Sequence, residues 1–129
     1  LDKFKRINDT YGHIFGDMVL KKTASIIRGS VRTVDTVARY GGEEFAVILI
    51  NADKNNSYKS AERIRSNIQS FVFEKDGIRE HITISIGMAE YPMDGTDVPT
   101  MISHADLAMY QSKRLGGNKV TLFKKEYAT

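Results

Sequence analysis

The sequence predicts an α+β domain in which helices cover a mostly antiparallel sheet. Segments whose apolar residues recur at helical spacing alternate with short apolar runs that are bounded by glycine-containing turns. The chain has 129 residues, 41% hydrophobic and 27% charged, which suits a single domain over residues 1–129. It has no cysteine, which excludes disulfides, thiolate zinc sites and cysteine nucleophiles. The net charge of +3 comes without any Lys/Arg block, so nothing indicates nucleic-acid binding.

The first half of the chain predicts a loop, a helix and two strands. Residues 1–16 are polar and rich in turn formers, so we expect a loop with some turn or helix. A helix is expected from Asp17, which would cap or lead it, because apolar residues follow at helical spacing: Leu20, Ala24, Ile27 and Val31. Strands are expected at 37–40 and 45–50, joined by a tight Gly-Gly turn with positive φ angles. The second strand is uniformly apolar, as in a strand buried on both faces.

The second half predicts two more helices and further strands. A helix with Ser57 as its cap is marked by apolar residues at helical spacing: Ala61, Ile64, Ile68 and Phe71. The remaining expected elements are a hairpin over 72–81, a strand over 82–87, a helix between Pro99 and Gly116, and a strand over 120–123.

Two adjacent carboxylates, Glu43 and Glu44, follow the glycine turn and precede the apolar strand. Neighbouring strand residues point to opposite faces, so the two acids cannot serve one ligand symmetrically. One carboxylate at a hairpin tip can hold a hard cation such as Mg²⁺, which keeps waters or phosphates as its other ligands. A solvated hairpin tip explains the same residues equally well, so these seven residues alone leave the choice open.

Polar residues near the start of the chain suggest a nucleotide site. Lys5 and exposed loop N–H groups could meet phosphate oxygens. Asn8 and Asp17 offer donors and acceptors that suit a purine edge. A carboxylate can accept from the N1–H and the exocyclic amine of guanine, whereas adenine has no N1–H to donate. The residues alone nevertheless favour ordinary turn and cap roles, and His13 by itself indicates little.

Two other features also have ordinary structural explanations. Lys113 near a helix end, followed by Gly116-Gly117, would usually be a favourable C-terminal charge and a C-cap. Arg32 and Asp35 would usually form a surface ion pair of small value. Arginine can also bind phosphate or guanine through two parallel hydrogen bonds, so a binding role for this pair stays open.

Taken together, these segments resemble the GGDEF domain family, the diguanylate cyclases, over about residues 1–123. Each segment is moderately specific, and their common order makes a chance match improbable. The signature of this chain is the Gly-Gly-Glu-Glu-Phe variant, which resembles those of active members. The matching segments are Phe4-Lys5-x-Ile7-Asn8-Asp9 with Gly12-His13 and Gly16-Asp17, then Arg39-Tyr40-Gly41-Gly42-Glu43-Glu44-Phe45, Thr83-Ile84-Ser85-Ile86-Gly87, and Ala105-Asp106-x-Ala108-x-Tyr110-x-x-Lys113.

The resemblance implies a fold like that of the nucleotidyl cyclases and the polymerase palm, with a ferredoxin-like core. It implies a bacterial signal-transduction transferase that condenses two GTP molecules into cyclic di-GMP and two pyrophosphates, with Mg²⁺ or Mn²⁺ bound. One domain holds one GTP, so two copies must meet as a homodimer, and an upstream sensor or receiver segment would control them. The implied location is cytoplasmic, with no nucleic acid and no membrane contact by this domain, although the parent protein could be membrane-anchored.

The resemblance also assigns roles to individual residues. It implies that Glu43 is the metal ligand and general base, and that Leu1 gives a backbone carbonyl to the metal. The other residues implied at the catalytic site are Lys5 and Lys113 for the phosphates, Asn8, His13 and Asp17 for guanine, Leu20 against the base, and Gly42 in substrate binding. An inhibitory site, where cyclic di-GMP would exert product feedback, is implied at Arg32, Asp35 and Arg63.

The chain departs from the family pattern at two places. Active members carry a metal-binding aspartate, at the end of a central strand, one residue before the position of Leu1. We therefore expect this chain to be a piece of a longer protein. The piece would lack the first strand of the domain and the aspartate at its end, so its metal site would have one carboxylate instead of two. The family usually has arginine where Gly117 stands, and Arg114 could substitute for it. The alternative function is a degenerate domain that binds GTP or cyclic di-GMP as a receptor or scaffold.

Overall fold

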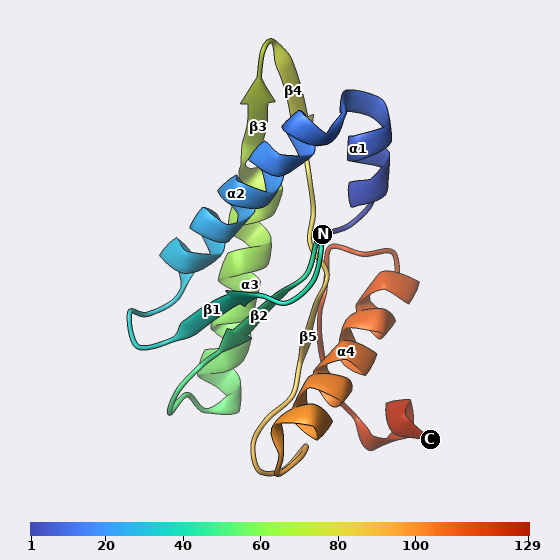
Figure 1. The fold of residues 1–129 in the computed structure, drawn as a ribbon. Helices are drawn as coiled ribbons and strands as arrows, with labels where there is room; N and C mark the ends of the chain where they lie inside the picture. Colours follow the sequence, from blue (N-terminus) through green and yellow to red (C-terminus); the bar gives the residue numbers. More distant parts are fainter.

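The computed structural model describes residues 1–129 and shows helices alternating with strands (Figure 1). The elements are, in chain order, α1 (Phe4–Tyr11), α2 (His13–Ser30), β1 (Thr36–Arg39), β2 (Phe45–Ile48), α3 (Lys54–Ser70), β3 (Val72–Lys75), β4 (Ile78–His81), β5 (Ile86–Met88), α4 (Val98–Arg114), β6 (Val120–Leu122) and the 3₁₀ helix η1 (Lys125–Ala128). The predicted α+β class is confirmed. None of the helices has both the length and the apolar composition that a membrane span requires.

The strands form three two-stranded pairs. β1 pairs antiparallel with β2, and β3 pairs antiparallel with β4. β5 and β6 are parallel, with Ile86 opposite Val120, which is possible because α4 forms the long crossover between them. Two of the three strand pairs are therefore antiparallel, as predicted for most of the sheet, whereas the parallel β5–β6 pair was not specifically predicted.

The hydrophobic core lies where α1, α2 and α3 meet the β3–β4 hairpin and the segment after it (Figure 1). Amphipathic helices bury their apolar stripes against one another and against the sheet, which is the main source of their stability. The buried cluster consists of Leu1, Phe4, Ile7, Phe15, Val19, Leu20, Ile27, Ile64, Ile68, Phe73, Ile82 and Ile84.

Helix α4 lies directly on strand β5, backbone against backbone. A Cβ atom on Gly87 would collide with the carbonyl oxygen of Ala105 and the backbone of Met109. The hydroxyl of Ser112, near the end of the helix, donates to the carbonyl oxygen of Ile86 at 3.0 Å. Glycine and serine together therefore fix the height and rotation of the helix that carries Lys113.

The structure corrects the prediction for residues 1–16 and the predicted beginnings of two helices. Residues 1–16 are mostly helical, since they contain α1 and the first turn of α2. Gly12, with a φ of 89°, separates the two helices, so α2 begins at His13. Asp17 therefore lies inside α2, and the prediction that it caps or leads the helix is wrong. The cap of α3 is Asp53 and not Ser57, because the Asp53 carboxylate accepts from the backbone N–H of Asn56 at 2.8 Å.

The structure also corrects three predictions about strands. Neither glycine between β1 and β2 has a positive φ, because a wider loop in which the Tyr40 and Gly41 N–H groups donate to the Glu44 carbonyl replaces the tight turn. β2 is not buried on both faces, since Ile48 is 61% exposed. In the predicted strand over 82–87, only Ile86 and Gly87 belong to β5, and residues 82–85 are not part of a strand. Of this segment, the Thr83 carbonyl accepts from the N–H of Asp2 at 3.0 Å.

Candidate functional site

Three residues far apart in the sequence meet at the start of the chain. The backbone nitrogen of Leu1 donates to the carbonyl oxygen of Glu43 at 3.2 Å. The ammonium group of Lys113, at the end of α4, lies 3.4 Å from the carbonyl oxygen of Leu1. The structure therefore brings together three of the four residues that the resemblance assigned to metal and phosphate, Leu1, Glu43 and Lys113. The fourth, Lys5, makes no hydrogen bond with them.

The oxygen donors at this point fit a hard divalent cation. They are the backbone carbonyl of Leu1 and the carboxylate of Glu43, a half-buried residue whose own backbone carbonyl accepts from the Leu1 nitrogen. Nowhere in the chain do three or more His, Cys, Asp or Glu side chains gather as a metal cluster. Mg²⁺ commonly binds one or two carboxylates and completes its shell with waters and substrate phosphates. The donor set suits Mg²⁺ that arrives with a nucleotide better than an ion enclosed by protein.

Sequence reasoning missed Asp2, which stands beside these residues. Its carboxylate accepts hydrogen bonds from Ser85 Oγ at 2.6 Å, Thr83 Oγ1 at 2.8 Å and the backbone N–H of Asn118 at 2.9 Å. Burial alone would raise the pKa of Asp2, but these hydrogen bonds and the charge of Lys113 outweigh it and lower the pKa. Asp2 is therefore held as a carboxylate. Its partners lie more than 80 residues along the chain, so no local pattern reveals them.

The hairpin of α1 and α2 carries the residues assigned to guanine. The side-chain oxygen of Asn8 occupies the space that a Cβ atom on Gly16 would need, so glycine at 16 lets α1 and α2 approach closely. Asp17 follows Gly16 and is exposed, as is His13 at the first position of α2. Lys5 is exposed on α1. The Asn8 side chain therefore lies against Gly16, the residue that precedes Asp17.

A second contact fixes α1 to the β3–β4 hairpin. The hydroxyl of Tyr11 donates to the Glu80 carboxylate at 2.6 Å, and its ring lies 5.0 Å from that of Phe15. The hydrogen bond to Glu80 raises the pKa of Tyr11. Arg6 pairs with the same carboxylate at 3.7 Å. These contacts, which sequence reasoning also missed, restrict the helix that presents Lys5 and Asn8.

Leu20 and Gly42 lie in contrasting surroundings. Leu20 is only 6% exposed and belongs to the core cluster below the helix pair, so its contacts in this structure are with the core. Gly42 is exposed in the loop before Glu43. Asp17 also lines a surface cavity of about 570 Å³, but that cavity runs along α2 toward Lys75 and does not include Asn8.

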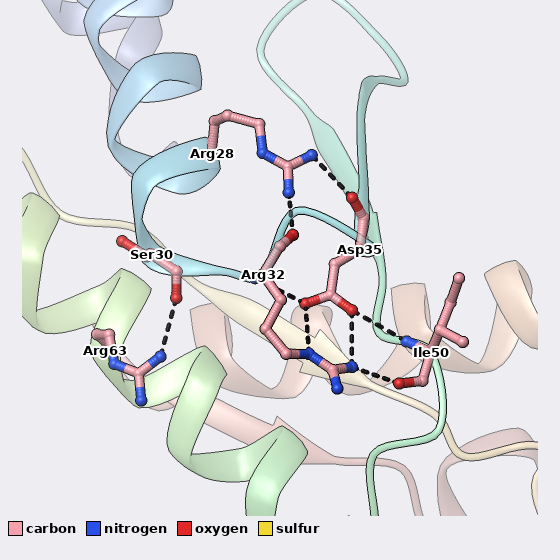
Figure 2. Close-up of polar contacts among 6 residues, drawn as sticks. All are labelled: Arg28, Ser30, Arg32, Asp35, Ile50 and Arg63. Carbon is pink, nitrogen blue, oxygen red and sulfur yellow. Dashed lines mark hydrogen bonds and ion pairs between the residues drawn. The ribbon is translucent and has the colours of Figure 1, made fainter.

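The candidate inhibitory site lies at the other end of the β1–β2 hairpin (Figure 2). Asp35 is 3% exposed, and its carboxylate accepts from the Nε atom of Arg32 at 3.1 Å and from the Nη2 atom at 2.9 Å. The backbone N–H groups of Arg32 and Ile50 also donate to it, at 2.9 and 3.1 Å. The hydrogen bond from the Arg32 side chain is the main cause that lowers the pKa of Asp35 to about 2.

Two further arginines border this pair (Figure 2). Arg63, on α3, donates to the carbonyl oxygen of Ser30 at 3.0 Å. Arg28, which sequence reasoning missed, donates to the Asp35 carbonyl at 2.8 Å and also to the Arg32 carbonyl. The Nη2 atom of Arg32 also donates to the Ile50 carbonyl, so all four hydrogen bonds of the Asp35 carboxylate come from the protein and only Nη1 of Arg32 is left without a protein partner. The Arg32 side chain is 53% exposed, which leaves this donor open to solvent.

Comparison with known proteins shows to which family this chain is similar. The family model described as "Diguanylate cyclase, GGDEF domain" matches residues 1–119. Diguanylate cyclase A of Treponema denticola is 46% identical over 124 residues, covering 96% of this chain and 33% of that protein. The chain therefore spans about a third of the length of this curated relative.

Two solved structures are also similar. The GGDEF domain of DgcB from Caulobacter crescentus in complex with c-di-GMP is 36% identical, with a TM-score of 0.87, covering 94% of this chain and 72% of that one. The active GGEEF domain of a diguanylate cyclase from Vibrio cholerae is 31% identical, with a TM-score of 0.87, covering 95% of this chain and 78% of that one. By sequence and by fold, this chain belongs to the GGDEF domain family of diguanylate cyclases.

Proposed function

We propose that the parent protein of this chain is a diguanylate cyclase that converts two GTP molecules into cyclic di-GMP and two pyrophosphates. In each half-reaction a 3′-oxygen forms a bond to the α-phosphorus of the other nucleotide. The bond from that phosphorus to the bridging oxygen breaks, the hydroxyl proton leaves, and pyrophosphate departs. The observation that carries the proposal is the meeting of Leu1, Glu43 and Lys113 from three distant parts of the sequence.

In each half-site, one group of residues would bind the phosphates and the metal, and another would bind guanine. Lys113 and Lys5 offset charge on the phosphates, and the exposed Gly42 lets phosphate oxygens approach the loop. Glu43 and the Leu1 carbonyl would hold Mg²⁺ or Mn²⁺, which would polarise the phosphate oxygens. Glu43 also takes the proton of the 3′-hydroxyl. The guanine side is formed by Asn8, His13 and Asp17, with Leu20 supporting it from the core.

A second copy of the domain is the required partner, because one half-site supplies one nucleotide. We propose that residues 1–129 form one such domain, and that a strand and an aspartate preceding Leu1 in the parent protein complete the sheet and the metal site. Leu1 and Asp2 already bond on one side to Glu43 and on the other to Thr83, as a strand between those segments would. The upstream segment would also carry a sensor or receiver, and the domain would work in the cytoplasm.

We propose product feedback at the second site, with cyclic di-GMP bound by Arg32 and Arg63. Arg32 is held by two nitrogens against Asp35 and remains half exposed, which preorganises it for guanine or phosphate oxygens. A domain without turnover that binds GTP or cyclic di-GMP as a receptor is the second candidate function. It is favoured by Gly117, which removes a phosphate contact that the family pattern provides.

Replacing Glu43 by Gln in the parent protein tests the catalytic proposal. The amide keeps the size of the side chain but loses the charge and the basicity, so formation of cyclic di-GMP should fall by at least about 100-fold. Glu74→Gln, at an exposed position of β3, is the matched control and should retain activity. Turnover that survives Glu43→Gln would contradict the assigned role, whereas a wild-type parent that binds GTP without turnover would support the receptor instead.

A further inference from the structure

We infer that Asp2 is a positioning residue that holds the Leu1 carbonyl and the Lys113 ammonium in place for the metal and phosphates of the nucleotide, an inference that rests on the proposed function. Asp2 belongs to none of the residue sets that the resemblance assigned. The role follows from the contacts of Asp2 with three other parts of the chain: residues 83–85, Lys113 and Asn118.

Both oxygens of the Asp2 carboxylate are fixed by protein donors. Oδ1 accepts from the Ser85 hydroxyl at 2.6 Å, and Oδ2 accepts from the Thr83 hydroxyl at 2.8 Å. The backbone N–H of Asn118 donates to Oδ2 at 2.9 Å. The side chain is only 11% exposed. Hydrogen bonds to a carboxylate are among the stronger ones in proteins, so these contacts fix residue 2 and the carbonyl that precedes it.

The remaining contact of the carboxylate is with Lys113. The ammonium lies 3.4 Å from Asp2 Oδ1 and 3.4 Å from the Leu1 carbonyl oxygen. Both separations exceed those of short charge-assisted hydrogen bonds, so Lys113 is held near the site without being fully engaged. A lysine that is already ordered loses less freedom when a phosphate binds, which is why preorganisation strengthens binding.

The Asp2 carboxylate can lie beside the loop after α4 because residue 117 is a glycine. The φ of Gly117 is +77°, and a Cβ atom there would lie only 2.9 Å from Asp2 Oδ2. The close approach lets Asp2 reach the N–H of Asn118, so the loop after α4 closes over the carboxylate. Asp2 thereby links the first residues of the chain to Lys113 near the end of α4 and to Asn118 in the loop that follows the helix.

The test uses the full parent protein with Mg²⁺ and 3′-deoxy-GTP, which lacks the attacking hydroxyl and therefore reports binding without turnover. Asp2→Asn keeps the size of the side chain but removes its charge. We expect its affinity for Mg²⁺·3′-deoxy-GTP, measured by calorimetry, to fall about 10- to 100-fold, as is typical for partners of metal ligands and phosphate contacts. The half-saturating Mg²⁺ concentration should rise as well. Asp76→Asn, in the β3–β4 turn, removes an equal charge and should bind like the wild type.

A second pair of variants keeps the test decisive if Asp2→Asn does not fold. Thr83→Val removes one hydroxyl donor at constant shape and should weaken binding about tenfold, whereas Thr83→Ser retains the hydroxyl and should restore most of the affinity. The inference is overturned if Asp2→Asn or Thr83→Val lowers the melting temperature but leaves the Mg²⁺ dependence within twofold of the wild type. A wild-type parent that binds no Mg²⁺·GTP would instead overturn the proposed function, and this inference with it.

Discussion

Replacing Gly16 by alanine tests the geometry of the guanine side of the site. Alanine in a helix interior normally stabilises by about 1 kcal/mol relative to glycine. Here the new Cβ atom would collide with the Asn8 side chain and lie 3.3 Å from the Phe4 ring, and overpacking of this kind costs about 1–3 kcal/mol. The matched control is Gly29→Ala in the same helix, where a Cβ atom meets nothing within 4 Å.

The difference between the two variants isolates the collision, because the helix-propensity gain is common to both. We expect Gly16→Ala to be less stable than Gly29→Ala by about 1–3 kcal/mol in urea unfolding. Adding Asn8→Ala to Gly16→Ala removes the obstructing oxygen and should recover at least about 0.5 kcal/mol as a coupling energy. Affinity for 3′-deoxy-GTP should fall in Gly16→Ala, since Asn8 is displaced. The reasoning is refuted if Gly16→Ala and Gly29→Ala are equally stable.

Two further predictions concern the second site. Arg32→Ala should raise the cyclic di-GMP concentration that half-inhibits the parent enzyme by at least about tenfold, since the charged donor that Arg32 leaves toward solvent is lost. Unchanged inhibition, with Arg79→Ala as control, would disprove the feedback proposal. Asp35 has a pKa of about 2 in the folded protein against an ordinary 3.8, so its stabilising contribution is complete above about pH 4 and is lost as the pH falls through 2. The stability difference between wild type and Asp35→Asn in urea should therefore shrink from pH 5 to pH 2.5, and a constant difference would contradict the assigned cause.

The elements that the sequence predicted well are those whose signal is local and periodic. Helix α3 follows its apolar spacing, and the β3–β4 hairpin follows its turn at Asp76-Gly77. Helix α1 was not predicted as an element, because its sequence is polar and its buried residues are only Phe4 and Ile7. The loop before Glu43 was mispredicted because paired glycines fit a tight turn equally well in sequence, and the hydrogen bonds of Glu44 decide between the two.

The site was predictable only as far as the family pattern reaches. Residue spacing alone could not place Lys113 beside Leu1, since they are 112 positions apart. Asp2 and Arg28 carry no local signal of their roles, because both act through backbone or hydroxyl groups that folding brings near them. The burial of Asp35 is likewise invisible in sequence, where an Arg and an Asp three residues apart suggest only a surface pair.

The contact of α4 with Gly87 limits how this protein can vary over evolutionary time. Where a helix rests on a strand through side chains, a larger residue on one can be offset by a smaller residue on the other. Backbone resting on backbone offers no such exchange, so substitution of Gly87 would lift the whole helix and carry Lys113 away from Leu1. The outer face of α4 remains free to drift, so its sequence can diversify among descendants while the lysine stays where it is.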